Sequence, residues 1–178
     1  MAILAILQYP DKRLRRVSVP VEVFDQSVQQ TIDDMFETHY ATPNCAALAA
    51  TQLDTVIPWR ITVIDASVTG STPLCLVNPQ IVAREGEQYE YEGCMSVYPD
   101  FIHDRVKRSE KIRVKAQDRD GKPLEFEATG YFAKCIQHEL DHLDGRVFID
   151  HLHTFKQAKV NRKIKLYLRT LKNNASEY

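Results

Sequence analysis

One stretch of this 178-residue chain decides its interpretation: Gln137-His138-Glu139-Leu140-Asp141-His142-Leu143. Residues four apart on an α-helix lie on one face, about one turn apart, so His138 and His142 project into the same space. Two imidazoles in this arrangement bind one divalent metal ion, and Glu139 lies beside it, where it transfers protons. The stretch therefore predicts a helix that carries a metal centre.

This helix is predicted to begin after Thr129, as its N-terminal cap, and to end near Gly145. Its buried stripe consists of Ala133, Ile136, Leu140 and Leu143. A distinct face carries Tyr131, Lys134, Cys135, His138 and His142. Asp141 points away from that face, and we expect it to form a structural ion pair with Arg108.

The third metal ligand is not downstream of the histidines. One class of zinc proteases continues the pattern as H-E-x-x-H-x-x-G-x-x-H, but position 148 is Phe here, and the only acid after residue 150 is Glu177. Cys94 follows Gly93, which has no Cβ to keep a metal at a distance. Two histidines, one cysteine and an open fourth position are typical of a catalytic site. The alternative for Cys94 is a buried apolar side chain.

The remaining signals predict a single α+β domain over residues 1–178, in which small antiparallel or mixed β-sheets pack around the helix with the histidines. An N-terminal helix is expected from its cap Asp25 to about Thr42, and residues 44–52 are expected to be extended. A basic C-terminal helix is expected over residues 155–172, with Val160, Ile164, Tyr167, Leu168 and Leu171 inward and a disordered tail at 173–178. The strand-like runs are 61–64, 74–77, 81–83, 88–91, 111–115 and 124–127.

Composition narrows the class of protein. The net charge is −1, so the whole chain has no general affinity for nucleic acid or membranes. No apolar run approaches the ~20 residues of a membrane span, and the N-terminus lacks the basic leader of a signal peptide. The four cysteines, at positions 45, 75, 94 and 135, are scattered, which favours free thiols in a reducing compartment. We therefore expect a cytoplasmic protein.

The motifs resemble those of the peptide deformylases, which carry G-x-G-x-A-A-x-Q, E-G-C-x-S and Q-H-E-x-D-H in this order. The second motif is intact as Glu92-Gly93-Cys94-Met95-Ser96, and the third as Gln137-His138-Glu139-Leu140-Asp141-His142. The first occurs in altered form as Cys45-Ala46-Ala47-Leu48-Ala49-Ala50-Thr51-Gln52. The resemblance extends from Ile3 to about Leu152 and so covers most of the chain.

The resemblance implies hydrolysis of the N-formyl group from nascent peptides that begin with formylmethionine. It implies that Cys94, His138 and His142 bind one divalent ion, which is iron, with nickel, cobalt or zinc as alternatives. Glu139 is then the general base and acid, and the developing oxyanion faces the Gln52 amide and the backbone N–H of Met95. The implied substrate-binding residues are Ala46, Ala47, Glu92, Gly93, Tyr131, Lys134 and Cys135.

Two departures leave alternatives open. Cys45 and Ala47 replace the glycines of the first motif, which is harmless at negative φ but strained at positive φ. Lys134 stands at a position that we expect to be apolar in other members of this family. Its ammonium either extends to water or makes the pocket polar. We therefore expect deformylation with an altered rate or side-chain preference. The alternatives are a paralogue without turnover and, less favoured, a metalloendopeptidase.

The basic C-terminal helix also permits two interpretations. It is either a solvated helix face or, as the resemblance implies, a handle that contacts ribosomal RNA phosphate.

Overall fold

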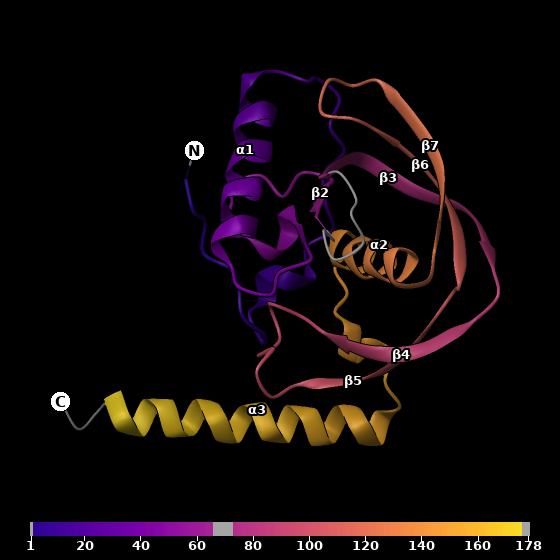
Figure 1. Ribbon diagram of the computed structural model, residues 1–178. Helices are drawn as coiled ribbons and strands as arrows, with labels where there is room; N and C mark the ends of the chain where they lie inside the picture. The colour runs from indigo at the N-terminus through magenta and orange to yellow at the C-terminus, as the bar shows by residue number, and fades with distance from the viewer. Residues whose placement is uncertain (1, 66–72, 176–178) are drawn as a thin grey trace.

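The computed structural model describes residues 2–65 and 73–175 (Figure 1). Two antiparallel sheets surround the helix α2 (Gly130–Leu143), with α1 (Gln26–Ala41) on one side and α3 (Thr154–Ala175) along the bottom of the view. The larger sheet has the strand order β1-β2-β3-β6-β7, and β4 and β5 form the smaller sheet. The α+β prediction is confirmed, and every pairing between these strands is antiparallel.

The strands and short helices have the following bounds: η1 (Lys12–Arg15), β1 (Ala47–Ala49), η2 (Ala50–Gln52), β2 (Ile61–Ile64), β3 (Leu74–Glu85), β4 (Gln88–Gly93), β5 (His103–Arg108), β6 (Lys111–Gln117), β7 (Pro123–Thr129) and η4 (Phe148–His151).

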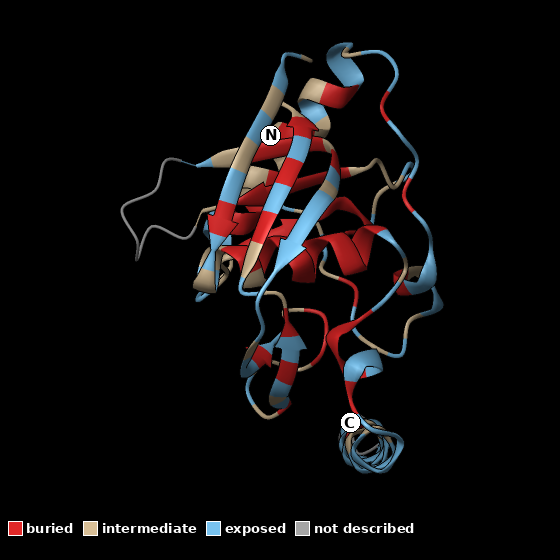
Figure 2. Cartoon of the chain, turned by 90° about the vertical axis from the view of Figure 1, so that its right-hand side faces the viewer, coloured by how far each residue is buried: buried red, intermediate tan, exposed pale blue. Residues whose placement is uncertain are grey.

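The helix α2 is the centre of the core. Ala133, Ile136 and Leu143 are fully buried and Leu140 is nearly so, which confirms the predicted stripe. The helix packs against β1, β2 and β7. Figure 2 shows it almost wholly buried behind the larger sheet, in which buried and exposed residues alternate along the strands. Its polar side chains from Gln137 onward are buried too. Burial of so many polar groups requires partners for them, and these partners build the site.

The helix ends were predicted with mixed success. Asp25 caps α1, because its carboxylate accepts from the backbone N–H groups of Ser27 and Val28. Thr129 stands at the N-cap of α2, but its side chain makes no capping hydrogen bond, so that part of the prediction is wrong. Gly145 follows α2 at φ +73°, a conformation that favours glycine.

Two strand predictions need correction. Residues 44–52 are extended only through β1, after which the chain turns into the 3₁₀ helix η2 that carries Gln52. The sequence analysis missed β5, because Val106 is the only apolar residue of this strand and the other side chains are polar or charged. The runs on either side of Gly86 lie in different sheets, since β3 pairs with β2 and β6 while β4 pairs with β5.

The helix α3 lies beside the body and is largely exposed. Ile164 is buried, and Val160 and Leu168 pack against the same apolar cluster. Tyr167 and Leu171 are 39% and 46% exposed, so their predicted inward orientation is wrong for Leu171 and only partial for Tyr167, which contacts Phe101. The helix continues to Ala175, beyond the predicted end, and residues 176–178 of the expected tail lie outside the described residues. No described helix is long and apolar enough to cross a membrane.

Candidate metal centre

Three predicted ligands converge at one buried point. The Sγ atom of Cys94 lies 3.1 Å from Nε2 of His142, and the two Nε2 atoms of His138 and His142 are 3.3 Å apart. All three donor atoms lie within 4.8 Å of one another. A tetrahedral ion with bonds of about 2.0–2.3 Å places its ligand atoms roughly 3.3–3.7 Å apart. The donor set and its spacing therefore fit one divalent metal ion.

Gln52 lies beside the ligand Cys94. The Gln52 Oε1 atom accepts from the backbone N–H of Ala49 at 2.8 Å, which fixes the amide plane. Its Nε2 atom then lies 3.6 Å from Cys94 Sγ and 3.2 Å from Ser96 Oγ. A buried amide held in this way presents its N–H₂ group beside the ligand atoms.

Glu139 is the only acid of α2 that faces the pocket beside the ligands. The residue is 3% exposed, and its Oε2 atom has no hydrogen-bond partner among the described residues. Burial is the largest influence on this group, and it raises the pKa of the Glu139 carboxyl to about 7. An unpartnered carboxylate in this position is suited to proton transfer.

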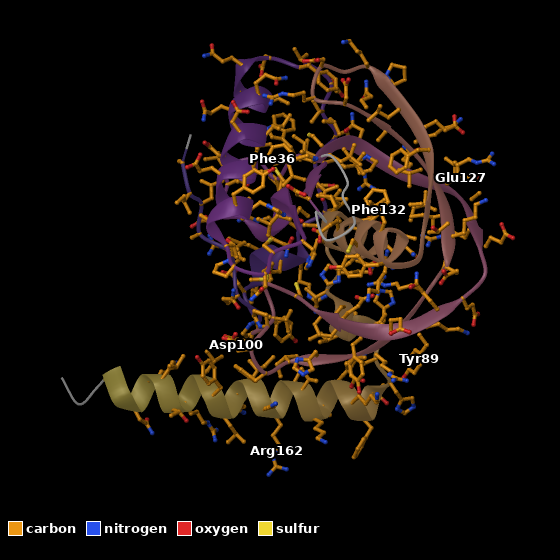
Figure 3. The ribbon with its side chains drawn as sticks, viewed as in Figure 1. Phe36, Tyr89, Asp100, Glu127, Phe132 and Arg162 are labelled. Carbon is orange, nitrogen blue, oxygen red and sulfur yellow. The ribbon has the colours of Figure 1, made fainter. Side chains whose placement is uncertain are left out.

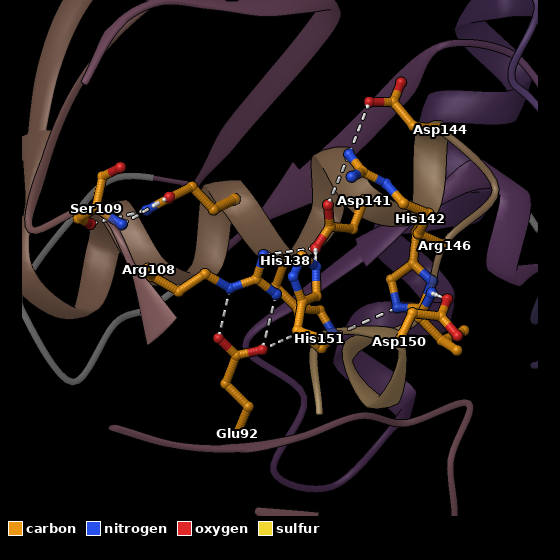
Figure 4. A network of polar contacts seen from close by, with 12 residues as sticks. Glu92, Arg108, Ser109, His138, Asp141, His142, Asp144, Arg146, Asp150 and His151 are labelled. Carbon is orange, nitrogen blue, oxygen red and sulfur yellow. Dashed lines mark hydrogen bonds and ion pairs between the residues drawn. The ribbon is translucent and has the colours of Figure 1, made fainter. Parts of the chain in front are cut away.

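A chain of buried ion pairs supports the ligands from behind (Figure 4). Glu92 Oε2 is 2.9 Å from Nδ1 of His138, and Arg108 donates to both oxygens of Glu92 at 2.8 and 3.0 Å. Burial alone would raise the pKa of Glu92, but hydrogen bonds from His138 and Arg108 outweigh it and lower the pKa to about 2. An N–H at Nδ1 leaves the Nε2 lone pair of His138 for a metal.

The other end of this chain is Asp141. It accepts from Arg108 at 2.5 Å, which confirms the predicted ion pair, and also from Arg146 and His151. Burial opposes ionisation of Asp141, but hydrogen bonds from His151 and Arg108 hold its pKa well below the ordinary range.

A cavity of about 270 Å³ opens beside the ligands. Every predicted substrate-binding residue lines it: Ala46, Ala47, Glu92, Gly93, Tyr131, Lys134 and Cys135. The cavity is also lined by Asn44, Tyr91 and Pro99, which were not among the predicted substrate-binding residues. The carboxylate of Glu92 is engaged by Arg108 and His138, so its side chain holds a ligand imidazole rather than facing the cavity. Asn44, Tyr91 and Pro99 lack a pattern of their own, and only the fold brings them to the cavity.

The altered first motif is not strained. Among the described non-glycine residues, positive φ occurs at Asn44, Asn78 and Tyr98, and not at Cys45 or Ala47. Cysteine and alanine therefore replace glycine at these positions without a backbone penalty. Burial raises the pKa of the Cys45 thiol to about 12, so this side chain stays neutral.

Position 148, where the zinc-protease pattern requires a third histidine ligand, has an apolar role in this fold. Phe148 is buried, and its ring stacks on the His138 imidazole at a centroid distance of 6.3 Å. A ring without a donor atom packs there, and the third ligand comes instead from Cys94.

A second hollow, of about 690 Å³, includes Arg84, Arg108 and Gln137 in its lining. Asp141 also lines it, and its carboxylate is paired with arginines of the same hollow. It contains none of the three convergent donors, so the smaller cavity is the candidate active site.

Comparison with known proteins agrees with this geometry. The model of the family described as polypeptide deformylase matches residues 3–158. The chain belongs to the polypeptide deformylase family. It is 57% identical over 159 residues to peptide deformylase 1 of Coxiella burnetii, covering 89% of this chain and 93% of that protein. It is 52% identical to the peptide deformylase of Chromobacterium violaceum, covering 93% and 96%.

Solved structures give the same result. The fold matches that of a peptide deformylase from Legionella pneumophila with a TM-score of 0.86 and 42% identity, covering 96% of this chain and 98% of the other. A peptide deformylase from Ehrlichia chaffeensis, solved with actinonin, matches with a TM-score of 0.84 and 37% identity, covering 94% and 98%. Family membership favours the deformylase interpretation over the endopeptidase.

Proposed function

We propose that this chain removes the N-formyl group from formylmethionyl nascent peptides by metal-dependent hydrolysis. The observation that carries the proposal is the convergence of Cys94, His138 and His142 beside an unpartnered Glu139, in a chain of the deformylase family. These three side chains would hold a divalent ion, which would lower the pKa of water towards about 7 and so supply a nucleophile near neutral pH.

The surrounding residues perform the remaining chemistry. Glu139 accepts the proton of the nucleophile and returns it to the departing amine, a role worth about 10²–10⁴ in rate. Gln52 donates from Nε2 to the oxyanion, because its Oε1 atom is held by Ala49. The backbone N–H of Met95 is the second donor, and each donor contributes about 3–4 kcal/mol.

Ferrous iron is the proposed native metal, with nickel, cobalt or zinc as functional substitutes. One thiolate and two imidazoles suit all of these ions, so the ligand set does not select one. The test is purification without oxygen, followed by metal analysis and a formate-release assay on the same sample. We expect iron in the anaerobic protein and loss of both iron and activity in air.

The decisive variant is Glu139→Gln, which preserves the volume of the side chain. It should retain the metal and lose about 10²–10⁴ in formate release. The control is Glu125→Gln, on the half-exposed face of β7, which should leave formate release unchanged. Absence of formate from metal-loaded protein, or full activity of Glu139→Gln, would contradict the proposal.

The cavity wall made by α2 receives the methionine side chain. The Lys134 Nζ atom donates to the backbone oxygen of Tyr91 at 3.0 Å and lies 5.1 Å from the centre of the Tyr131 ring. These contacts hold the ammonium, and Lys134 lines the cavity. We propose that its apolar stem faces the substrate. We therefore expect a preference for formyl-Met over formyl-Glu peptides, changed less than about threefold by Lys134→Met. A preference for formyl-Glu that disappears in Lys134→Met would establish the polar pocket instead.

The helix α3 is proposed to contact ribosomal RNA. Its sequence contains no acidic residue, and Arg162 points away from the body in Figure 3. The basic residues are Lys156, Lys159, Arg162, Lys163, Lys165, Arg169 and Lys172. The proposed substrate, the nascent chain, emerges at the ribosome, so ribosome contact through α3 would suit a cytoplasmic enzyme.

Ribosome contact can be tested without removing the buried Ile164. Co-sedimentation with ribosomes should weaken with salt and with the triple change of Arg162, Lys165 and Arg169 to Gln. The control changes three lysines of the β6–β7 hairpin to Gln: Lys111, Lys115 and Lys122. Equal ribosome binding by the two triple variants would favour the alternative that the basic face of α3 is only solvated.

A further inference from the structure

The outer face of the two-stranded sheet carries an unusual set of side chains. Three cross-strand pairs form it: Tyr89 with Lys107, Tyr91 with Arg105, and Gly93 with His103. Tyr89 and Tyr91 are 53% and 58% exposed. The face therefore presents aromatic and basic groups without a carboxylate among these six residues.

Arg105 is held in place at the centre of this face. Its guanidinium carbon lies 5.0 Å from the centre of the Tyr91 ring and 5.9 Å from that of Tyr89. Cation–π contacts of this kind hold the guanidinium beside the rings, and its N–H groups can still donate to a ligand. Among the described residues, no carboxylate forms an ion pair with the Arg105 side chain.

Two neighbouring lysines already have carboxylate partners. Lys107 pairs with Glu87 at 2.6 Å, and Lys156 at the start of α3 pairs with Asp104 at 2.6 Å. One uncompensated guanidinium matches one carboxylate, whereas a polyphosphate chain requires several free cations. The charge pattern thus favours an acidic side chain over nucleic acid.

This face is continuous with the candidate active site. Tyr91 and Gly93 line the cavity, and Lys134 on α2 bonds to the backbone of Tyr91. The Arg105 guanidinium carbon lies 5.0 Å from the ring centre of Tyr91, which lines the cavity. An extended peptide advances about 3.3 Å per residue, so this separation corresponds to one or two residues of a bound peptide.

We propose that Arg105, held between Tyr89 and Tyr91, is a specificity-determining residue that binds an acidic side chain of the substrate shortly after its formylated first residue. This inference rests on the proposed function and assigns that function a preferred substrate class, formyl peptides with Glu or Asp at one of the next three positions. Arg105 binds substrate away from the metal, so it affects KM and leaves kcat unchanged.

The experiment compares formyl-Met peptides that carry Glu, Gln or Lys at the second, third or fourth position, with alanine elsewhere. At low salt, Glu should exceed Gln in kcat/KM by about two- to fivefold at one position, the range of an exposed ion pair. The difference should lie in KM and disappear at high salt. Arg105→Gln should abolish it, and Arg105→Glu should reverse it in favour of Lys. Arg113→Gln, on the exposed side of β6, is the control and should retain the preference.

Equal kcat/KM for Glu and Gln at all three positions would overturn this inference while formate release upheld the proposed function. A preference that survives Arg105→Gln would also overturn it. Binding of a single-stranded RNA oligonucleotide that is lost in Arg105→Gln, without peptide discrimination, would assign the face to nucleic acid instead. Absence of formate from every peptide would overturn both proposals.

Discussion

Glu92 lies with its Oε2 atom 2.9 Å from Nδ1 of His138, on the opposite side of the ring from the Nε2 atom that faces His142. The carboxylate thereby fixes both the orientation and the tautomer of the imidazole. Because Arg108 holds Glu92 in turn, the metal centre is coupled to a buried ion-pair chain that begins on β4 and β5.

Replacing Glu92 should weaken metal binding. Glu92→Gln removes the charged acceptor at Nδ1 of His138, and loss of such a partner typically costs about 10–100-fold in metal affinity. Competition with a chelator, followed by metal analysis, measures the change. Glu90→Gln on the same strand is the control, because Glu90 is exposed. Equal metal retention by the two variants would refute the proposed role of Glu92.

Removal of Arg108 should strongly destabilise the protein. Arg108→Met leaves the carboxylates of Glu92 and Asp141 buried without their shared cation, and breaking such a pair costs about 3–5 kcal/mol. Urea unfolding of the metal-loaded protein measures this loss. Arg113→Met removes the half-exposed partner of Glu127 and should cost less than about 1 kcal/mol. Similar losses in both variants would show that the buried chain contributes little.

Gly93→Ala should separate stability from activity. No atom lies within 4 Å of a Cβ built at Gly93, so the folded protein accepts the methyl group. Alanine in a strand is favoured over glycine by about 0.5–1 kcal/mol, so the free energy of unfolding should hold or rise. Because Gly93 lines the cavity, KM for formyl peptides should rise at least several-fold. An unchanged KM would show that substrate does not approach this backbone.

Gly145→Ala should cost much more stability than Gly130→Ala. Both glycines have positive φ, +73° and +55°, and this conformation costs alanine about 1–2 kcal/mol. At Gly145 the new Cβ would also lie 2.7 Å from the backbone oxygen of Arg15, whereas at Gly130 the nearest atom is at 3.8 Å. We expect a difference of roughly 1–3 kcal/mol in urea unfolding. Equal losses would mean that the chain around Arg15 moves freely.

The buried thiol of Cys75 should make stability depend on pH in the alkaline range. Burial raises the pKa of Cys75 from 9.0 to about 12, so the folded state retains a proton that the unfolded state loses. Its contribution is present below about pH 9 and falls by about 1.4 kcal/mol per pH unit as the pH rises towards 12.

The measurement is urea unfolding between pH 9 and 10.5. The stability difference between wild type and Cys75→Ala should shrink as the pH rises, because the variant lacks this group. Val77→Ala, on the same strand and also buried, should show a constant difference. A constant difference for Cys75→Ala as well would contradict the raised pKa.

The sequence was sufficient for the elements with strong periodic signals. The helix α2 and its apolar stripe follow from 3.6-residue spacing, and the same spacing places His138 and His142 on one face. The cap Asp25 and the hairpin of β6 and β7 also follow from local patterns. The strand β5 was missed, because its mostly charged side chains give only a weak strand signal. The partners of its buried groups lie far away in the chain, so no local pattern identifies them.

The amino-acid sequence by itself identified the three donors that converge in the structure, Cys94, His138 and His142, because H-E-x-x-H on a helix and the isolated Cys94 suit one metal ion. Only the tertiary structure decided how they are held. The contacts of Glu92 with His138, of Phe148 with His138, and of Tyr91 with the cavity join separate segments. Contacts of this kind depend on long-range packing, which imposes no period on the chain and leaves no local pattern to be read.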